Sequence, residues 1–404
     1  MTKCVDAKNH QAAELDLKLG LLGSRRVSSL RKIEFRVFTI LPFATHMRTV
    51  PRRILIVRPS AFGDVCRTVP LLWSLRKTFP KAVIDWVVED RWSSAIQEHP
   101  AIDGVIKFPK REFRSCWRNP RTAIKTIQWF WRLRRGRYDL VIDAQGLARS
   151  GLMSWVTRAK VRVADRSGRE FSWLAANRRV NRVAGSHVVD AMLQLVAEVG
   201  VIPITDMRLV TPAVDLAWWR DEAARRKIVG PFIVIAAGNV WEGKRWISQR
   251  WGELLRSVAD DFANRGIQDV VWIGAPGEEE QIAELCNDAS SISQLRSHNL
   301  AGLTSVGGTM AVIQNASFII ALDSAPVHLA VGFAVPFVAL YGATQPSSDG
   351  PYQAQMWCVH GGRGEELGRH DYRDSRKGLE MMKRISTEEV VALVRKRLQG
   401  GAES

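Results

Sequence analysis

Short apolar runs recur along the chain and alternate with amphipathic stretches of helical length. They lie at residues 54–59, 82–90, 104–109, 138–146 and 161–166, and again at 232–239, 269–277, 318–322 and 335–342. Strands that are apolar on both faces are typical of parallel sheets covered by helices. Their alternation with helices indicates βαβ units. The pattern therefore predicts an α/β protein with two Rossmann-like, doubly wound halves that face a central cleft.

The pattern weakens at three places, which divide the chain. We expect a basic N-terminal extension at residues 1–50, one Rossmann-like domain at 51–205 and a second Rossmann-like domain at 206–375. A last helix and tail, 376–404, should pack back on the body. The extension is either a disordered tail or a surface-binding arm. The helix at 186–200 should be capped by Ser186.

The charge balance points to an anionic partner. Among 404 residues, 58 Lys and Arg outnumber 41 Asp and Glu, a formal net charge of +17. Such a surplus suits nucleic acid, an anionic membrane surface or a phosphorylated substrate. The five cysteines are scattered without a CxxC pair, which predicts reduced thiols in a cytoplasmic protein.

No metal site is expected. The eight histidines lack the spacing of metal ligands, and no Asp-x-Asp is present to hold a metal–diphosphate pair. We also find no transmembrane run and no signal peptide, so membrane contact should be peripheral.

The first candidate site follows the strand at 54–59, where PSAFGD leads into a helix. It lacks the G-x-G-x-x-G of a dinucleotide site. Gly63 predicts a tight turn, and Asp64 stands at the mouth of the helix. Asp64 is either a helix N-cap or a general base for a substrate hydroxyl.

A second candidate site follows the strand at 318–322. Asp323 and Ser324 lead into a short helix that carries His328. Free N–H groups at a helix N-terminus suit a phosphate. The simpler alternative is an ordinary N-cap with a buried core histidine.

Residues 107–137 hold eleven Lys and Arg and one acidic residue, Glu112, with Trp117, Trp129 and Trp131 interleaved. This mixture fits nucleic-acid binding, a solvated helix face over a tryptophan core, or a dock for an anionic glycolipid. The pattern alone leaves all three open.

Several stretches carry a resemblance to a known family. They are ILIVRPSAFGDV, DWVVED, YDLVIDAQGLARS, GKRW, GAPGEEE and LDSAPVHLA with YGATQP, in this order between about Arg52 and Gly361. They resemble the bacterial lipopolysaccharide heptosyltransferases, glycosyltransferase family 9 of the GT-B type, and look most like its heptosyltransferase I members.

This resemblance implies an inverting, metal-independent transfer without a cofactor. Heptose would move from ADP-L-glycero-D-manno-heptose to a Kdo-lipid A type acceptor in lipopolysaccharide inner-core biosynthesis. The expected partners are the nucleotide-sugar donor, the anionic glycolipid and the inner leaflet of the cytoplasmic membrane, with no nucleic acid. The protein would be a cytoplasmic, peripherally bound monomer, although the sequence leaves the oligomeric state open.

The resemblance also assigns roles to domains and residues. The domain at 51–205 would bind the acceptor, and the domain at 206–375 would bind the nucleotide-sugar donor. Asp64 would be the general base, Lys244 would face the donor diphosphate and Glu278 would bind the nucleotide. The donor site would further include Asp323, Ser324, Ala325, His328, Asn239, Val240 and Thr304. The acceptor site would include Lys110, Arg111, Arg114, Arg118 and Arg149.

Two departures from the family pattern keep alternatives open. Asn239 and Val240 replace a pair of hydroxyl residues, and Ala325 replaces the commoner glycine. The first change favours a GT-B transferase with another nucleotide-sugar donor. A further alternative is a non-catalytic nucleic-acid-binding protein that uses residues 107–137.

Overall fold

The fold was analysed in a computed structural model, which describes residues 49–368 and 371–400. The predicted N-terminal extension therefore lies almost wholly outside the described residues.

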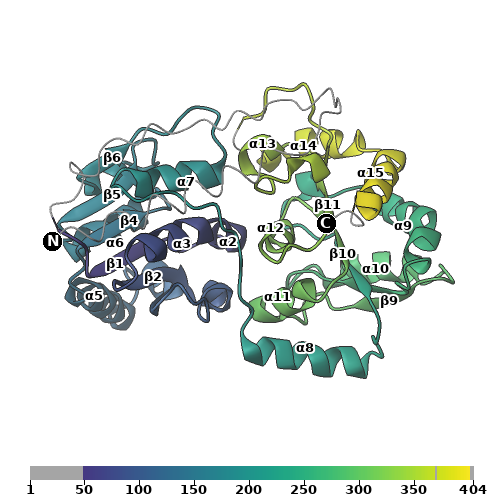
Figure 1. The fold of residues 1–404 in the computed structure, drawn as a ribbon, viewed down its shortest axis with the longest axis horizontal. Helices are drawn as coiled ribbons and strands as arrows, with labels where there is room; N and C mark the ends of the chain where they lie inside the picture. Colours follow the sequence, from purple (N-terminus) through teal and green to yellow (C-terminus); the bar gives the residue numbers. More distant parts are fainter. Residues whose placement is uncertain (1–48, 369–370, 401–404) are drawn as a thin grey trace, which may run out of the picture. The chain divides into compact units, whose positions relative to one another are not determined.

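The first half contains a parallel six-stranded sheet in the order β3-β2-β1-β4-β5-β6 (Figure 1). Its strands are β1 Arg53–Val57, β2 Val83–Glu89, β3 Gly104–Phe108, β4 Leu140–Asp143, β5 Val161–Asp165 and β6 Arg178–Val180. Its helices are α2 Phe62–Arg67, α3 Val69–Thr78, η1 Asp90–Ala95, α4 Lys110–Ser115, α5 Pro120–Arg135, α6 Ala148–Thr157, η2 Ser172–Ala175 and α7 Val188–Ala197.

The second half repeats this arrangement, with the strand order β12-β11-β10-β7-β8-β9, again all parallel. Its strands are β7 Phe232–Ala236, β8 Asp269–Trp272, β9 Arg296–Asn299, β10 Phe318–Leu322, β11 Phe337–Tyr341 and β12 Cys358–His360. Its helices are α8 Ala213–Arg225, η3 Glu242–Lys244, α9 Ser248–Ala263, α10 Glu279–Ala289, α11 Val306–Gln314, α12 Ala325–Gly332, α13 Pro346–Asp349, η4 Gln355–Trp357, η5 Asp371–Arg373, α14 Ser375–Lys383 and α15 Thr387–Gln399.

Both sheets have the doubly wound order 3-2-1-4-5-6, so the predicted fold class is confirmed. In such a sheet the strand order reverses between the first and fourth strands, and ligands bind at that point beyond the carboxyl ends of the strands. Here the switch points lie between β1 and β4 and between β7 and β10. Each half thus offers one natural binding position.

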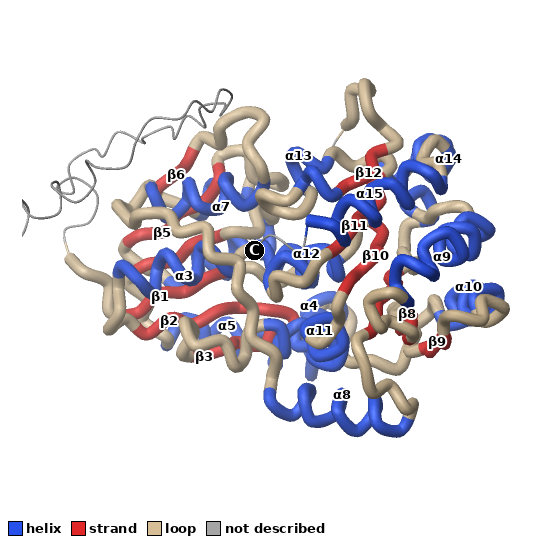
Figure 2. The backbone as a smooth tube through the Cα atoms, turned by 45° about the vertical axis from the view of Figure 1, so that its right-hand side comes forward, coloured by secondary structure: helices blue, strands red, loops and turns tan. Residues whose placement is uncertain are grey.

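Helices cover both faces of each sheet (Figure 2). In the first sheet Leu55 and Val57 face α5 and α6, whereas Ile54 and Ile56 face α3 and α7. The second face of this sheet belongs to a buried cluster that continues into α11 and α12 of the other half. One continuous hydrophobic core therefore runs through both halves.

The structure corrects one helix boundary. Helix α7 begins at Val188, and its N-cap is His187, whose Nδ1 accepts a hydrogen bond from the N–H of Val189 at 3.1 Å. The predicted cap, Ser186, instead donates to the carbonyl of Val183 at 2.8 Å. The His187 ring is also fixed by its Nε2, 3.1 Å from the carbonyl oxygen of Gly350, so the imidazole is already oriented to serve as the cap.

A close backbone contact supports the segment that carries Lys244. Helix α14 packs on η3, and a Cβ added at Gly378 would lie 2.4 Å from the carbonyl oxygen of Gly243. Only glycine permits this approach. The position of Lys244 therefore depends on a helix more than 130 residues further along the chain.

We predict that Gly378→Ala destabilises the protein by about 1–3 kcal/mol, because the added methyl group must push α14 away from η3. Urea unfolding measures this loss. Gly400→Ala is the matched control, since a Cβ there meets no atom within 4 Å. Equal stability of the two variants would contradict the proposed contact.

Candidate active site

The two switch points meet around one cavity of about 330 Å³. From the first half it is lined by Asp64 and Asp143, which lie after β1 and at the end of β4. From the second half it is lined by Lys244 and Asp323, which lie after β7 and β10. The cavity therefore occupies the position that the doubly wound topology predicts for a ligand in each half.

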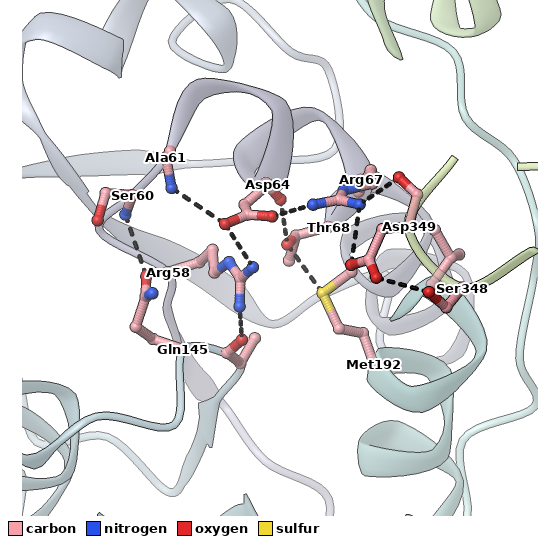
Figure 3. Close-up of polar contacts among 12 residues, drawn as sticks. Arg58, Ser60, Ala61, Asp64, Arg67, Thr68, Gln145, Met192, Ser348 and Asp349 are labelled. Atoms are coloured by element: carbon pink, nitrogen blue, oxygen red, sulfur yellow. Dashed lines mark hydrogen bonds and ion pairs between the residues drawn. The ribbon is translucent and has the colours of Figure 1, made fainter. Parts of the chain in front are cut away.

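Asp64 is held between two arginines (Figure 3). Its Oδ2 lies 3.0 Å from Nη2 of Arg58, and its Oδ1 accepts a hydrogen bond from Nη2 of Arg67. Asp64 is the third residue of α2 and accepts from the N–H of Ala61 at 3.2 Å, so the N-cap is Ala61 and not Asp64. Its carboxylate is thereby fixed at the wall of the cavity.

The arginines decide the ionisation of Asp64. Burial alone would raise the pKa of its carboxyl, but the charges of Arg58 and Arg67 hold the pKa well below the usual range. Asp64 is therefore an anion throughout the physiological range. Its affinity for a proton is correspondingly low.

Arg67 also reaches the opposite half. Its Nη1 donates to the carbonyl oxygen of Asp349 at 2.8 Å and lies 3.7 Å from the Asp349 carboxylate (Figure 3). Asp349 is the last residue of α13. A single buried guanidinium therefore joins Asp64 to the second half of the protein.

Lys244 and Asp323 form the corresponding pair in the second half. Nζ of Lys244 lies 2.5 Å from Oδ2 of Asp323, and both side chains are largely buried. Asn239 donates from Nδ2 to the carbonyl oxygen of Asp323 at 3.0 Å. Asn239 thus ties the end of β7 to the end of β10.

His328 and Thr344 line this cavity, and each also has a buried polar atom. Nδ1 of His328 and Oγ1 of Thr344 are buried and have no hydrogen-bond partner among the described residues. Burial lowers the pKa of His328 well below its usual value, so its ring is neutral. Buried polar groups normally have partners, so these two atoms are among the exceptions in the described part of the chain.

Gly63 is required for a reason other than the predicted tight turn. It lies inside α2, and a Cβ there would come 2.8 Å from Cδ2 of His328. The glycine lets α2 approach α12 across the two halves. This contact places His328 next to the turn of helix that carries Asp64.

Asp143 and Thr344 were not among the predicted site residues. The signal for Asp143 was its place at the end of a strand, in DAQGLARSG. Its Oδ1 accepts from the N–H groups of Gln145 and Gly146, both at 3.0 Å, and its Oδ2 accepts from Ser150 Oγ at 2.9 Å. Burial raises the pKa of Asp143 to about 6.

The other predicted donor residues lie outside the lining of this cavity. Glu278 is the N-cap of α10 and accepts from the N–H of Ala275 at 2.8 Å, Val240 is exposed, and Thr304 bonds to Thr309. Ser324 and Ala325 form the start of α12, directly after Asp323. Their roles stay predictions.

The predicted acceptor residues lie elsewhere. Lys110, Arg111 and Arg114 line a separate cavity of about 650 Å³, where Nζ of Lys110 lies 2.8 Å from buried Glu89. Arg118 stacks on the ring of Trp117. Arg149 is nearer the site, since its Nη2 donates to Ser60 Oγ at 3.1 Å.

Comparison with known proteins assigns the family. The sequence model of glycosyltransferase family 9 (heptosyltransferase) matches residues 127–377, more than half of the chain. The chain belongs to this family. It is therefore a glycosyltransferase, and this favours an enzyme over the non-catalytic nucleic-acid-binding alternative.

Individual relatives agree with the family. The chain is 32% identical over 307 residues to lipopolysaccharide heptosyltransferase 1 of Pseudomonas aeruginosa, covering 74% of this chain and 81% of the relative. It is 28% identical over 321 residues to lipopolysaccharide heptosyltransferase 1 of Escherichia coli K12, covering 76% and 93%.

Solved structures share the fold. A family 9 glycosyl transferase from Veillonella parvula superposes with a TM-score of 0.72 at 21% identity, covering 86% of this chain and 98% of that one. E. coli heptosyltransferase WaaC, solved with ADP, superposes with a TM-score of 0.65 at 24% identity, covering 85% and 99%. These likenesses support the GT-B assignment of the glycosyltransferase.

The described residues contain neither a metal-binding cluster nor a membrane-spanning helix. Among them, no three His, Cys, Asp or Glu side chains gather so that they could hold a metal ion. Within the same part of the chain, every helix is too short or too polar to cross a membrane. Metal independence and location stay predictions.

We predict that Asp143→Asn becomes more stable relative to wild type as pH rises from about 4 to about 6. In that window the unfolded Asp143 loses its proton, whereas the folded one, with its raised pKa, keeps it. Folding therefore carries a growing penalty that the amide avoids, up to about 3 kcal/mol. Urea unfolding of both proteins across this range tests it, and a stability difference independent of pH would contradict it.

Proposed function

We propose that this glycosyltransferase moves heptose from ADP-L-glycero-D-manno-heptose to a Kdo-lipid A type acceptor in lipopolysaccharide inner-core biosynthesis. The supporting observation is the convergence of Asp64 from one half with Lys244, Asp323 and His328 from the other on one cavity. The heptosyltransferase 1 relatives support the choice of sugar and acceptor. The structures of E. coli WaaC with ADP and with ADP-2-deoxy-2-fluoro heptose support the choice of nucleotide.

The proposed reaction is a direct displacement with inversion. The acceptor hydroxyl oxygen attacks the anomeric carbon, and the bond from that carbon to the diphosphate oxygen breaks with its electron pair on ADP. The hydroxyl proton passes to Asp64. The transfer takes place late. Until then the proton stays on the attacking oxygen, which becomes a glycosidic oxonium as the new bond forms and is then a far stronger acid than an alcohol. A carboxylate of low basicity, as Arg58 and Arg67 make Asp64, is sufficient to accept it at that stage.

The leaving diphosphate would be met by Lys244 and His328. Lys244 supplies a full positive charge in a largely buried setting, where it stabilises developing negative charge strongly. The neutral ring of His328 supplies a hydrogen bond rather than charge. We propose that these groups and the start of α12 support departure of ADP without a metal ion.

The wall contributed by the first half suits an anionic acceptor. Arg58, Arg169 and Arg182 all line the cavity together with Asp64. A carboxylate or phosphate of the acceptor would find guanidinium groups there, which bind such anions in a bidentate manner. We therefore place the charged sugar of the acceptor in this cavity. The predicted roles of Lys110, Arg111, Arg114 and Arg118 would then concern a more distant part of the glycolipid.

A transferase with a different nucleotide-sugar donor is the second candidate. It is favoured by Asn239, which stands where hydroxyl residues are usual in the family. The Asn239 side chain donates to the carbonyl oxygen of Asp323 and accepts from the N–H of Trp241. A changed partner near the diphosphate would be expected if the donor differs.

The first test is thermal-shift binding of ADP, UDP, GDP and CDP with EDTA or with magnesium. We expect selective stabilisation by ADP under both conditions, and a weaker shift for Lys244→Ala because the diphosphate loses its cation. Lys244→Arg keeps the charge and should restore much of the shift. Selective binding of UDP, GDP or CDP would establish the second candidate instead.

The role of Asp64 is tested by Asp64→Ala and Asp64→Glu. We expect both to lose about 100-fold or more in turnover, the usual scale for a general base, while ADP affinity persists. Asp64→Ala leaves Arg58 and Arg67 without their shared anion, so it should also melt at a lower temperature. Asp64→Glu keeps the anion and separates this loss of stability from the loss of chemistry. Near-normal turnover of Asp64→Ala would remove Asp64 from the proton transfer.

A further inference from the structure

The outer surface of the first half carries an unusual set of exposed apolar side chains. We name it the aromatic face and define it as Trp117, Ile124, Ile127, Trp131, Leu152, Trp155, Phe171 and Leu174. Of the five large aromatic side chains exposed among the described residues, four lie in this set. Single exposed apolar residues are ordinary, but a gathering of this kind marks an interaction site.

All of these residues except Trp117, which precedes α5, lie on or directly beside three neighbouring elements. Helices α5 and α6 pack side by side on one face of the first sheet (Figure 1), and η2 packs against α6. Ile124, Ile127 and Trp131 are three and four residues apart, so they project from one side of α5. The opposite side of α5 buries Leu133 against the sheet. The exposed side therefore points away from the core.

Cations accompany the apolar stripe of α5. Arg121, Lys125, Arg132 and Arg135 are exposed on the same helix, which contains no acidic residue. Tryptophan and aliphatic side chains with flanking Arg and Lys are the composition of surfaces that lie in the interface of an anionic bilayer. The apolar groups enter the boundary of the acyl chains, and the cations contact lipid phosphates.

The aromatic face continues directly from the wall of the active site. Gln145 and Gly146 line the catalytic cavity, and the helix that follows them contributes Leu152 and Trp155 to a shallow hollow of about 310 Å³. Likewise Arg169 lines the cavity, while Phe171 and Leu174 line the hollow.

Hydrogen bonds join the two segments. The N–H of Arg169 donates to Gly146 at 2.9 Å, and the N–H of Ala148 donates to Glu170 at 3.0 Å. A molecule with its sugar in the cavity thus has an apolar surface immediately beside it.

We propose that the aromatic face is a docking surface for an anionic lipid bilayer. This proposal rests on the proposed function in one respect, that a lipid-borne acceptor would bring the enzyme to a membrane. Docking there holds the cavity beside the lipid surface, and the hollow between α6 and η2 receives acyl chain as the acceptor's sugar enters the cavity.

Other occupants fit the surface less well. A second copy of the chain would place the same cations against each other, and residues 1–48 also contain more Lys and Arg than Asp and Glu. Nucleic acid would use the cations and aromatic rings but gains nothing from Ile124, Ile127, Leu152 and Leu174. A bilayer uses all of them.

Vesicle flotation with the full-length chain tests the proposal without donor or acceptor. Wild type should float with vesicles of phosphatidylglycerol and phosphatidylethanolamine and bind weakly to phosphatidylcholine alone. The combined variant Ile127→Gln, Trp131→Gln, Trp155→Gln should lose about tenfold or more in binding, with unchanged melting temperature and ADP affinity. The combined variant Arg121→Gln, Lys125→Gln, Arg132→Gln should lose binding to the anionic vesicles in a salt-dependent way.

The matched control is Val214→Gln, Val229→Gln, Met356→Gln, which removes three exposed apolar side chains from the second half. It should bind vesicles as wild type does. The proposal is overturned if wild type ignores vesicles, or if control and aromatic-face variants lose binding equally. Three other results would also overturn it. If wild type is a dimer that the aromatic-face variant dissociates, the surface binds a second copy of the chain. If the variant only lowers the melting temperature, the surface serves the fold itself, and if the variant loses RNA binding in place of vesicle binding, the surface binds nucleic acid.

Failure of vesicle binding leaves the proposed transferase function intact, because turnover on a deacylated acceptor is a separate readout. On that water-soluble acceptor the aromatic-face variant should match wild type. With the acceptor carried in vesicles, its apparent KM should rise while kcat is kept.

Discussion

The carboxylate of Asp64 is shared between two buried arginines, and the arrangement of the site depends on this. Arg58 comes from the end of β1 and also donates to the carbonyl of Ala144 at the end of β4. Arg67 comes from α2 and reaches Asp349 in the other half. Buried charges persist only when they are paired and hydrogen-bonded. The charge network therefore links the first switch point to the second half.

Much of the fold follows from the sequence pattern, and the parts that do not are informative. The central strands β1, β4, β7 and β10 are buried on both sides, so their residues form continuous apolar runs. Strands β6, β9 and β12 escaped prediction because each lies at the edge of its sheet, spans three or four residues and is partly exposed. The segment RSHN of β9 contains no large apolar residue, so the sequence gives no sign of a strand there. It is a strand because it pairs with β8.

The candidate site likewise contains residues that the sequence predicted and residues that only the structure revealed. Asp64, Lys244, Asp323 and His328 stand in local motifs, and the structure brings them to one cavity. Arg67 gave no signal, because its importance arises from its contact with Asp349, which lies far away in the chain. The basic stretch at 107–137 had the opposite difficulty. Its composition left three interpretations open, and the resemblance to the family implied acceptor binding. Lys110, Arg111 and Arg114 line a cavity other than the one that Asp64 lines, which only the tertiary structure reveals.

The hydrophobic cluster that runs through both halves has a consequence for how the halves can move. Val189 and Met192 of α7 belong to the same cluster as Val327 and Leu329 of α12. Separating the halves would expose this apolar surface to water, which is unfavourable in proportion to its area. The segment 201–212 connects the halves without helix or strand, but the shared hydrophobic cluster also joins them. Any motion that opens the halves therefore carries the cost of exposing this shared apolar surface, whereas a small sliding of packed helices would keep it covered.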